Sequence, residues 1–261
     1  MARRGARITY LGHSTVLLEQ EGVRVLTDPV LADRFLHLRR HSASVEAPAG
    51  PLDCVLISHV HHDHLHPASL RRLPAVTPVI APAGGGRLVE RSGIHRVHEV
   101  GAGETLELGE LGIEAVPANH PRGRPPFGPD AEPLGYLIEV GSWRAYFAGD
   151  TDLFDEMSGF GDLDLALLPV WGWGTSIGEG HLDPRGAVEA LRRLRPRFAI
   201  PIHWGTFLPV GTRRRNRRLL RDPGREFARL AAEASLPTEV RVLAPGASTV
   251  IGAADKRRGR E

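Results

Sequence analysis

The stretch Ser58-His59-Val60-His61-His62-Asp63-His64 is the feature of this 261-residue chain that most strongly indicates its fold. It follows the apolar run 52–57, which has the length of a buried strand, and precedes Pro67, which suits the first turn of a helix. The histidines are therefore expected on a loop between a strand and a helix. Because alternate side chains of an extended segment share a face, His59 and His61 can converge on one point.

The last two residues of this stretch indicate a second site beside the first. Asp63 and His64 are both good ligands for a borderline metal ion, but adjacent residues do not easily join one tetrahedral centre. Two neighbouring ions are therefore the simpler interpretation. Chance produces this spacing on the order of once in a thousand such chains, so a histidine-rich surface loop is the weaker alternative.

Length and composition predict one sizeable domain. A hydrophobic fraction of 41% is sufficient for a core, and no Ser/Gly/Pro-rich linker divides the chain. We expect a single domain over residues 1–252 and a basic, disordered tail over residues 253–261. The formal net charge of +2 does not by itself indicate a nucleic-acid partner.

The single cysteine, Cys54, lies within an apolar run, where a small core residue is more common than a nucleophile or ligand. One cysteine allows no internal disulfide, which favours a reducing compartment. The N-terminus carries no apolar signal segment, and no apolar run approaches the length that spans a membrane. We expect a soluble, cytoplasmic protein.

Hydrophobic patterning predicts mostly strands at first and an alternation of strands and helices after the motif. A β-meander is expected over 7–11, 15–19 and 23–26, followed by an irregular segment, 30–51, with a helical turn near 32–36. Helices are expected over 67–73, 86–92, 153–157 and 184–194, the last capped by Asp183. Further strands are expected over 78–81, 105–108, 112–116, 134–140, 143–148, 164–168 and 198–202.

Three more potential ligands directly follow predicted strands, namely His120, Asp150 and His203. A carboxylate between two close cations lowers their mutual repulsion, so Asp150 is a candidate bridging ligand. The alternative for Asp150 is a turn residue that caps the helix expected over 153–157.

Other charged and imidazole side chains carry weaker signals. His13, His37 and His41 have no ligand-like neighbour at useful spacing, and we expect them to be surface or packing residues. Arg122 and Arg124 lie on a proline-stiffened loop, where they either hold an anionic group of the substrate or remain solvated.

Taken together, the ordered ligand set resembles that of the metallo-β-lactamase fold superfamily of hydrolases. The set comprises His59, His61, Asp63, His64, His120, Asp150 and His203. Three segments look like the branch that holds N-acyl-phosphatidylethanolamine phospholipase D and L-ascorbate-6-phosphate lactonase. They are Tyr10-Leu11-Gly12-His13-Ser14, Gly149-Asp150-Thr151 and Ile202-His203-Trp204-Gly205-Thr206-Phe207, and the resemblance spans nearly the whole chain.

This resemblance implies an α/β fold, the four-layer αββα sandwich, with two divalent ions at one edge of its sheets. It implies that one ion is bound by His59, His61 and His120, and the other by Asp63, His64 and His203. Asp150 would bridge them. Zn²⁺ suits this set of imidazoles and carboxylates, and Mn²⁺ or Fe²⁺ would fit it too.

The implied activity is metal-dependent hydrolysis, in which a metal-bridging hydroxide attacks a carbonyl or phosphoryl ester. A small lactone or phosphodiester is the expected substrate class. Asp63 and His181 are the candidate catalytic residues. His181 lies in a His-x-x-Pro pattern shared with the lipase-like and lactonase-like relatives, so we expect it to act on the substrate; the alternative is a helix-start histidine that only packs.

A rival interpretation is a nuclease or RNA-processing phosphodiesterase of the same fold. The basic run Arg213-Arg214-Arg215-Asn216-Arg217-Arg218 could neutralise phosphates. However, no aromatic residue interleaves with these arginines, and a charge run is usually a solvated helix face. We therefore favour the small substrate over nucleic acid, with the oligomeric state left open.

Overall fold

Alternating burial along β1 (Ala6–Gly12) shows a strand with one face on the core. β1 pairs antiparallel with β2 (Thr15–Gln20), which pairs in turn with β3 (Val23–Thr27), and this confirms the predicted meander. The computed structural model describes residues 5–252 except 125 and 127, so the predicted tail over residues 253–261 lies outside the described residues.

The first sheet has seven strands in the order β17-β1-β2-β3-β6-β7-β8. From β3 onward its strands are parallel. All residues of β6 and β7 are buried because helices cover the face that turns away from the second sheet. The bounds of these elements are β6 Cys54–Leu56, β7 Val79–Pro82, β8 Val97–Val100, β17 Ser248–Ile251, α1 Pro67–Leu70 and α2 Gly86–Glu90.

The second sheet also has seven strands, in the order β16-β14-β13-β12-β11-β10-β9. Its outer face is covered by α3 (Pro184–Leu194) and α5 (Asp222–Glu233). The predicted cap of α3 is confirmed, since Oδ1 of Asp183 accepts a 2.7 Å hydrogen bond from the amide of Gly186. The strands are β9 Thr105–Leu108, β10 Leu111–Pro117, β11 Leu134–Val140, β12 Trp143–Phe147, β13 Leu165–Pro169, β14 Phe198–Ile202 and β16 Glu239–Val240.

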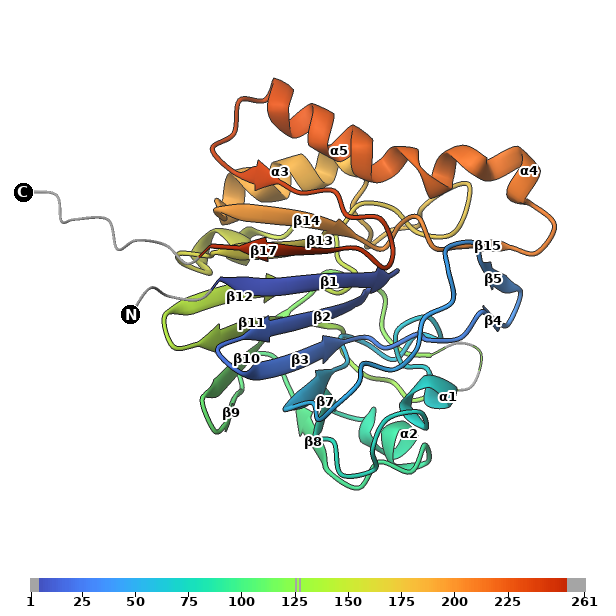
Figure 1. The fold of residues 1–261 in the computed structure, drawn as a ribbon, viewed down its shortest axis with the longest axis vertical. Helices are drawn as coiled ribbons and strands as arrows, with labels where there is room; N and C mark the ends of the chain where they lie inside the picture. Colours follow the sequence, from blue (N-terminus) through green and yellow to red (C-terminus); the bar gives the residue numbers. More distant parts are fainter. Residues whose placement is uncertain (1–4, 125, 127, 253–261) are drawn as a thin grey trace, which may run out of the picture.

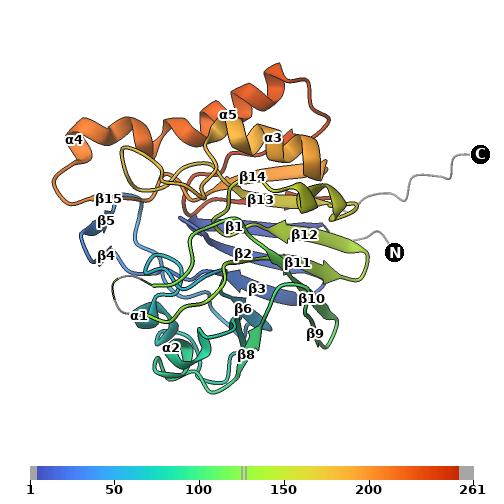
Figure 2. The same cartoon turned by 180° about the vertical axis from the view of Figure 1, so that it is seen from behind.

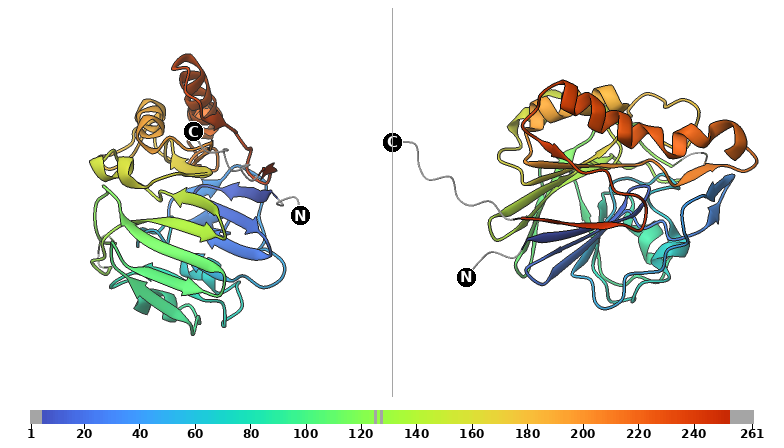
Figure 3. Two further views of the ribbon diagram at one scale, coloured as in Figure 1. Left: turned by 90° about the vertical axis from the view of Figure 1, so that its left-hand side faces the viewer. Right: turned by 45° about the horizontal axis from the view of Figure 1, so that its top comes forward.

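The two sheets pack against each other with helices on both outer faces, which confirms the four-layer αββα sandwich. Figure 1 shows α3 and α5 on one side of the strands and α1 and α2 on the other, and Figure 2 shows the same layers from behind. Figure 3 shows the two sheets lying face to face. Their shared core contains side chains such as Ile8 and Tyr10 from the first sheet and Ile113 and Tyr136 from the second.

The helical turn predicted near 32–36 is wrong. This segment is a hairpin of β4 (Arg34–Phe35) and β5 (Leu38–Arg40), to which β15 (Phe207–Pro209) adds a third strand. Phe35 and Leu38 pack with Phe207, and the buried Arg40 donates to the carbonyl of Val30. Tertiary packing therefore overrides the local pattern.

Some predicted helices are shorter than expected. The helix expected over 67–73 ends at Leu70, and the one expected over 86–92 ends at Glu90. The segment expected over 153–157 is a 3₁₀ turn, η1 (Asp155–Gly159). The basic run forms α4 (Arg213–Asn216) and η2 (Arg217–Leu220), which contain no buried residue. No helix of the described chain is both long and apolar enough to cross a membrane.

The candidate ligands gather because the strands that carry them run in the same direction within each sheet. β1, β3 and β6 point one way in the first sheet, and β10, β12, β13 and β14 do so in the second. The loops after these strands therefore meet at one edge of the sandwich. In Figure 1 this is the edge toward which the β1 arrow points.

Candidate metal centre

Three histidines form a first cluster. His59 and His61 come from the loop after β6, and His120 from the loop after β10. Nδ1 of His61 lies 3.0 Å from Nε2 of His59 and 3.0 Å from Nε2 of His120. Three ring nitrogens therefore face one point. This is the arrangement expected if His59 and His61 bind one ion together and His120, which follows a strand of the other sheet, adds the third ligand.

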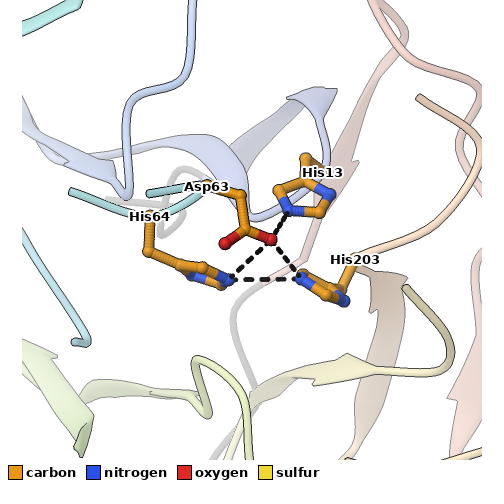
Figure 4. Close-up of side chains that lie close together, drawn as sticks. All are labelled: His13, Asp63, His64 and His203. Carbon is orange, nitrogen blue, oxygen red and sulfur yellow. Dashed lines mark hydrogen bonds and ion pairs between the residues drawn. The ribbon is translucent and has the colours of Figure 1, made fainter. Parts of the chain in front are cut away.

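A second cluster lies beside the first and contains two further histidines and two carboxylates. Nε2 of His64 is 3.2 Å from Nε2 of His203, and each lies 3.1 Å from Oδ2 of Asp150. Oδ2 of Asp63 lies 3.6 Å from Nε2 of His203 and 3.9 Å from Nε2 of His64 (Figure 4). The three histidines of the first cluster could hold a metal ion, and so could Asp63, His64 and His203 together with the neighbouring His13.

Backbone carbonyls determine which nitrogens of two of these rings can bind an ion. Nδ1 of His120 lies 2.7 Å from the carbonyl oxygen of Gly180, and Nδ1 of His203 lies 2.7 Å from that of Trp171. A carbonyl only accepts, so the Nδ1 atoms carry the protons. The inward Nε2 atoms are then the nitrogens that can offer a lone pair to an ion. Both carbonyls belong to the segment 170–182 that follows β13.

The inner side of His64 is supported by a carboxylate that the sequence interpretation did not include. Oδ2 of Asp28 lies 2.6 Å from Nδ1 of His64, and both side chains are fully buried. Asp28 also accepts hydrogen bonds from the amide of Ser58 at 2.7 Å and from its hydroxyl at 2.5 Å. Asp28 thus joins the end of β3 to the loop after β6. A carboxylate behind a histidine ligand is a common arrangement in metal sites.

Asp150 lies beside both clusters, because a ligand atom of its carboxylate is within 4.8 Å of one of His120 in the first cluster. Its Oδ2 faces His64 and His203, whereas Oδ1 is buried and has no hydrogen-bond partner among the described residues. A buried carboxylate oxygen without a partner is costly unless something positive satisfies it. The free Oδ1 therefore fits a second cation on the other side of the carboxylate.

The electrostatics of the site favour positive charge in its centre. Burial lowers the pKa of His59 well below its usual range and that of His120 to about 4, so both rings are neutral near pH 7. Burial opposes a charge on His64 as well, yet the carboxylates of Asp150, Asp28 and Asp63 raise its pKa well above the usual value. The same carboxylates would attract a metal cation.

The donor set and its spacing fit divalent ions. Nitrogen ligands bind zinc at about 2.0–2.1 Å, so tetrahedral ligand atoms lie roughly 3.3 Å from one another. The nitrogen separations within the clusters, 3.0 Å and 3.2 Å, are near this value. In the first cluster, where the rings of His59 and His120 are neutral, inward lone pairs at this distance would repel one another without a cation.

Known proteins of one superfamily resemble this chain over most of its length. Residues 23–204 match the family described as the beta-lactamase superfamily domain. The chain belongs to this superfamily. Within the matched region lie all seven predicted ligands, and the architecture of two sheets flanked by helices is that of the metallo-β-lactamase fold.

Relatives of this β-lactamase superfamily member include metal-dependent hydrolases. It is 34% identical over 253 residues to the "UPF0173 metal-dependent hydrolase" of Methanopyrus kandleri, with 93% of this chain and 98% of that protein covered. It is 33% identical over 218 residues to an uncharacterized protein of Mycobacterium tuberculosis. That alignment covers 77% of this chain but 59% of the mycobacterial protein, so the chain spans little more than half of that relative's length.

A solved structure shows the same fold. Igni18, described as a novel metallo hydrolase from the archaeon Ignicoccus hospitalis, has a TM-score of 0.73 and 26% sequence identity. The alignment covers 95% of this chain and 99% of Igni18. The superfamily member described here and Igni18 therefore share one fold over nearly their whole lengths.

His181 lies at the edge of the centre in this β-lactamase superfamily member. Its Nε2 is 3.5 Å from Oδ2 of Asp150, and its ring packs edge-on against His120 at 4.6 Å between centroids. Nδ1 lies 3.1 Å from the carbonyl oxygen of Glu179. Burial alone would lower the pKa of His181, but the hydrogen bond and negative charge of Asp150, together with the carbonyls of Gly178 and Glu179, outweigh burial and raise the pKa.

His13, which was expected to be a surface or packing residue, is buried and lies beside the candidate ligands. Its side chain is 1% exposed, and its Nε2 lies 3.0 Å from Oδ2 of Asp63. His13 follows β1 in the turn Gly12-His13-Ser14, just as the predicted ligands follow their strands. Its position directly after a strand was the available signal. His37, in contrast, is exposed at the hairpin and packs against Trp173.

The two arginines of the 121–129 loop have structural partners. Arg122 forms exposed ion pairs with Asp130 and Glu132. Nη1 of Arg124 donates to the carbonyls of Val60 and Leu65, at 2.5 Å and 2.9 Å. The alternative of two solvated arginines is therefore wrong for Arg124, which braces the loop that carries the motif.

Proposed function

We propose that this protein is a dinuclear metal-dependent hydrolase of a small ester, lactone or phosphodiester. The observation that carries the proposal is the position of Asp150 between two ligand clusters. One of its oxygens faces His64 and His203, and the other is buried without a partner among the described residues. A bridging carboxylate is what two closely spaced cations require.

The proposed first ion is held by His59, His61 and His120, and the second by Asp63, His64 and His203. Zn²⁺ is the preferred ion because imidazole nitrogens dominate the set, with Mn²⁺ or Fe²⁺ as alternatives. When bound, such ions supply Lewis acidity and lower the pKa of a coordinated water, which makes hydrolysis possible without a serine or cysteine nucleophile.

His181 is the proposed proton donor to the leaving oxygen. Its Nδ1 faces carbonyl oxygens and its Nε2 faces Asp150, so acceptors surround both nitrogens and favour a ring that can give a proton. Asp63 is the proposed catalytic carboxylate, in addition to its place in the ligand set. General acid–base groups of this kind contribute about 10² to 10⁴ in rate.

The substrate class in this proposal rests on the resemblance to the phospholipase D and lactonase branch, carried by the segments 10–14, 149–151 and 202–207. We extend the proposal to a cytoplasmic location, because the only cysteine of the chain, Cys54, is a buried thiol with no disulfide.

A substrate panel tests the proposal. Metal-free protein would be reloaded with Zn²⁺ or Mn²⁺ and assayed against a series of lactones, bis-p-nitrophenyl phosphate and single-stranded RNA. Metal-dependent turnover of a lactone or of the small phosphodiester is the expected result. Turnover of RNA alone would contradict the small-substrate proposal and favour the nuclease, for which the exposed arginines of α4 and η2 are the supporting feature.

A further inference from the structure

Asp63 is held by two nitrogen donors that come from different parts of the fold. Nε2 of His13 lies 3.0 Å from its Oδ2, and Nε1 of Trp173 lies 3.1 Å from the same oxygen. An indole nitrogen is only a donor, and an ionised carboxylate is only an acceptor. Both contacts therefore place a proton on the nitrogen, and Oδ2 accepts two hydrogen bonds.

The backbone of His13 is fixed by its surroundings. Its φ of +57° is in the left-handed region, where a non-glycine residue persists only when neighbours hold it. The amide of His13 donates to Oγ1 of Thr206 at 2.8 Å, and its carbonyl accepts from the amide of His203 at 2.7 Å. The ring also packs against that of His203, with 4.0 Å between centroids. These contacts hold His13 in place, and Figure 4 shows its ring nitrogen facing the carboxylate of Asp63.

Trp173 approaches Asp63 from the segment 170–182. The indole is half-buried and packs against a small apolar cluster, to which the hairpin contributes Phe35 and Leu38, β15 contributes Phe207, and the segment before the hairpin contributes Val30. Its ring also meets His37 edge-on at 5.0 Å between centroids. The hairpin therefore supports the tryptophan, and the tryptophan supports the carboxylate.

We propose that His13 and Trp173 are positioning residues that hold Oδ2 of Asp63 against the His64 and His203 pair, and so set the affinity of the second ion. The inference rests on the proposed function, because it assumes that Asp63 is a ligand. His13 lies close enough to Asp63, His64 and His203 to be considered a ligand itself. However, its Nε2 carries the proton that Asp63 accepts, and a protonated nitrogen has no lone pair for a metal.

Without these donors the carboxylate would have to be ordered by the ion alone. Asp63 lies on a loop and its side chain is 14% exposed, so it retains rotamers that point away from His64 and His203. Groups that orient a ligand typically change metal affinity by about 10- to 100-fold when removed. The effect is expected on the second ion, because the first cluster contains neither donor.

The test is a titration of metal-free protein with Co²⁺, followed by visible absorption, together with chelator competition with Zn²⁺. Trp173→Phe keeps the aromatic ring and removes the donor, and His13→Ala removes the other donor. Each variant should bind the second ion about 10- to 100-fold more weakly and bind the first ion with unchanged affinity. His13→Gln, whose amide can still donate, should recover most of the loss. Matched controls are Trp143→Phe at the far end of β12 and exposed His95→Gln, both with unchanged affinities.

The outcomes separate the inference from the function on which it rests. Two bound ions with unaltered affinities in Trp173→Phe and His13→Ala would overturn the inference and leave the dinuclear proposal intact. Equal loss of the second ion in His13→Gln and His13→Ala would make His13 a ligand and would also overturn it. A wild-type protein that binds a single ion would contradict the dinuclear proposal and the inference together. Affinity for the first ion serves in every variant as the measure of intact folding.

Discussion

Oδ2 of Asp28 lies 2.6 Å from Nδ1 of His64, and neither side chain is exposed to solvent. The pair joins the end of β3 to the loop after β6, and the same carboxylate accepts from the backbone and hydroxyl of Ser58. Asp28 therefore fixes both the fold of the motif loop and the direction in which His64 presents its other nitrogen.

Replacing Asp28 should affect stability and metal affinity together. Asp28→Ala leaves the amide of Ser58 and Nδ1 of His64 without an acceptor, and each buried unpaired group costs about 1–3 kcal/mol. We expect a loss of about 2–5 kcal/mol in the free energy of unfolding, measured by urea titration of metal-free protein. Asp53→Ala, which removes an exposed carboxylate that accepts from the amide of Arg24, is the control and should cost about 1 kcal/mol. Equal stability of the two variants would contradict this role of Asp28.

Metal content provides the most direct prediction about Asp150. Purified protein should hold about two divalent ions per chain after mild dialysis, because two ligand clusters share this carboxylate. Asp150→Asn should lose metal and nearly all hydrolytic activity, and chelation of the wild type should lower its melting temperature. Elemental analysis and thermal unfolding measure these effects. An Asp150→Asn protein that remains loaded and active would remove Asp150 from the bridging role.

His181 should affect turnover more than metal content. His181→Ala is expected to retain both ions and the native fold, while kcat falls by about two decades or more, because a proton donor near the leaving oxygen is lost. Steady-state kinetics and metal analysis on the same preparation are the measurements. An unchanged kcat would make His181 a packing residue, whereas loss of an ion would make it a ligand through its contact with Asp150.

The arginines of α4 and η2 separate the small-substrate hydrolase from the nuclease. Changing Arg214, Arg215 and Arg217 together to Gln should leave turnover of a small substrate within about threefold, since these side chains are exposed. RNA binding should be negligible before and after the change. Filter binding at two salt concentrations checks this, and salt-sensitive binding that vanishes in the variant would support the nuclease.

The sequence predicted the parts of the fold that depend on local patterns. Alternating burial marks β1 and β10, and a continuous apolar run marks β6, so these strands could be predicted from hydrophobic periodicity. The αββα sandwich was implied by the resemblance of the ligand set to that of the metallo-β-lactamase superfamily. The hairpin of β4 and β5 could not, because its two strands have two and three residues and depend on packing with Phe207.

The residues that hold the candidate ligands in place could not be predicted from the sequence, for a different reason. The contacts of Asp63 with His13 and Trp173 join residues 50 and 110 positions apart, and that of His64 with Asp28 spans 36. Metal ligands often recur at a recognisable spacing along the sequence. A side chain that hydrogen-bonds to a ligand can come from any part of the chain that passes nearby. A single sequence contains no pattern that specifies such distant pairs, although each of these residues follows a strand.

The direct contact of His64 with His203 has a consequence for the order of events during synthesis. These residues are 139 positions apart and lie on loops that follow strands of different sheets, so an ion bound by both would connect the two sheets. The first sheet is itself completed by β17, which pairs with β1 from the other end of the described chain. A nascent chain that has released only the histidine motif therefore holds part of the candidate site, and an ion bound after His203 emerges would connect two sheets made at different times.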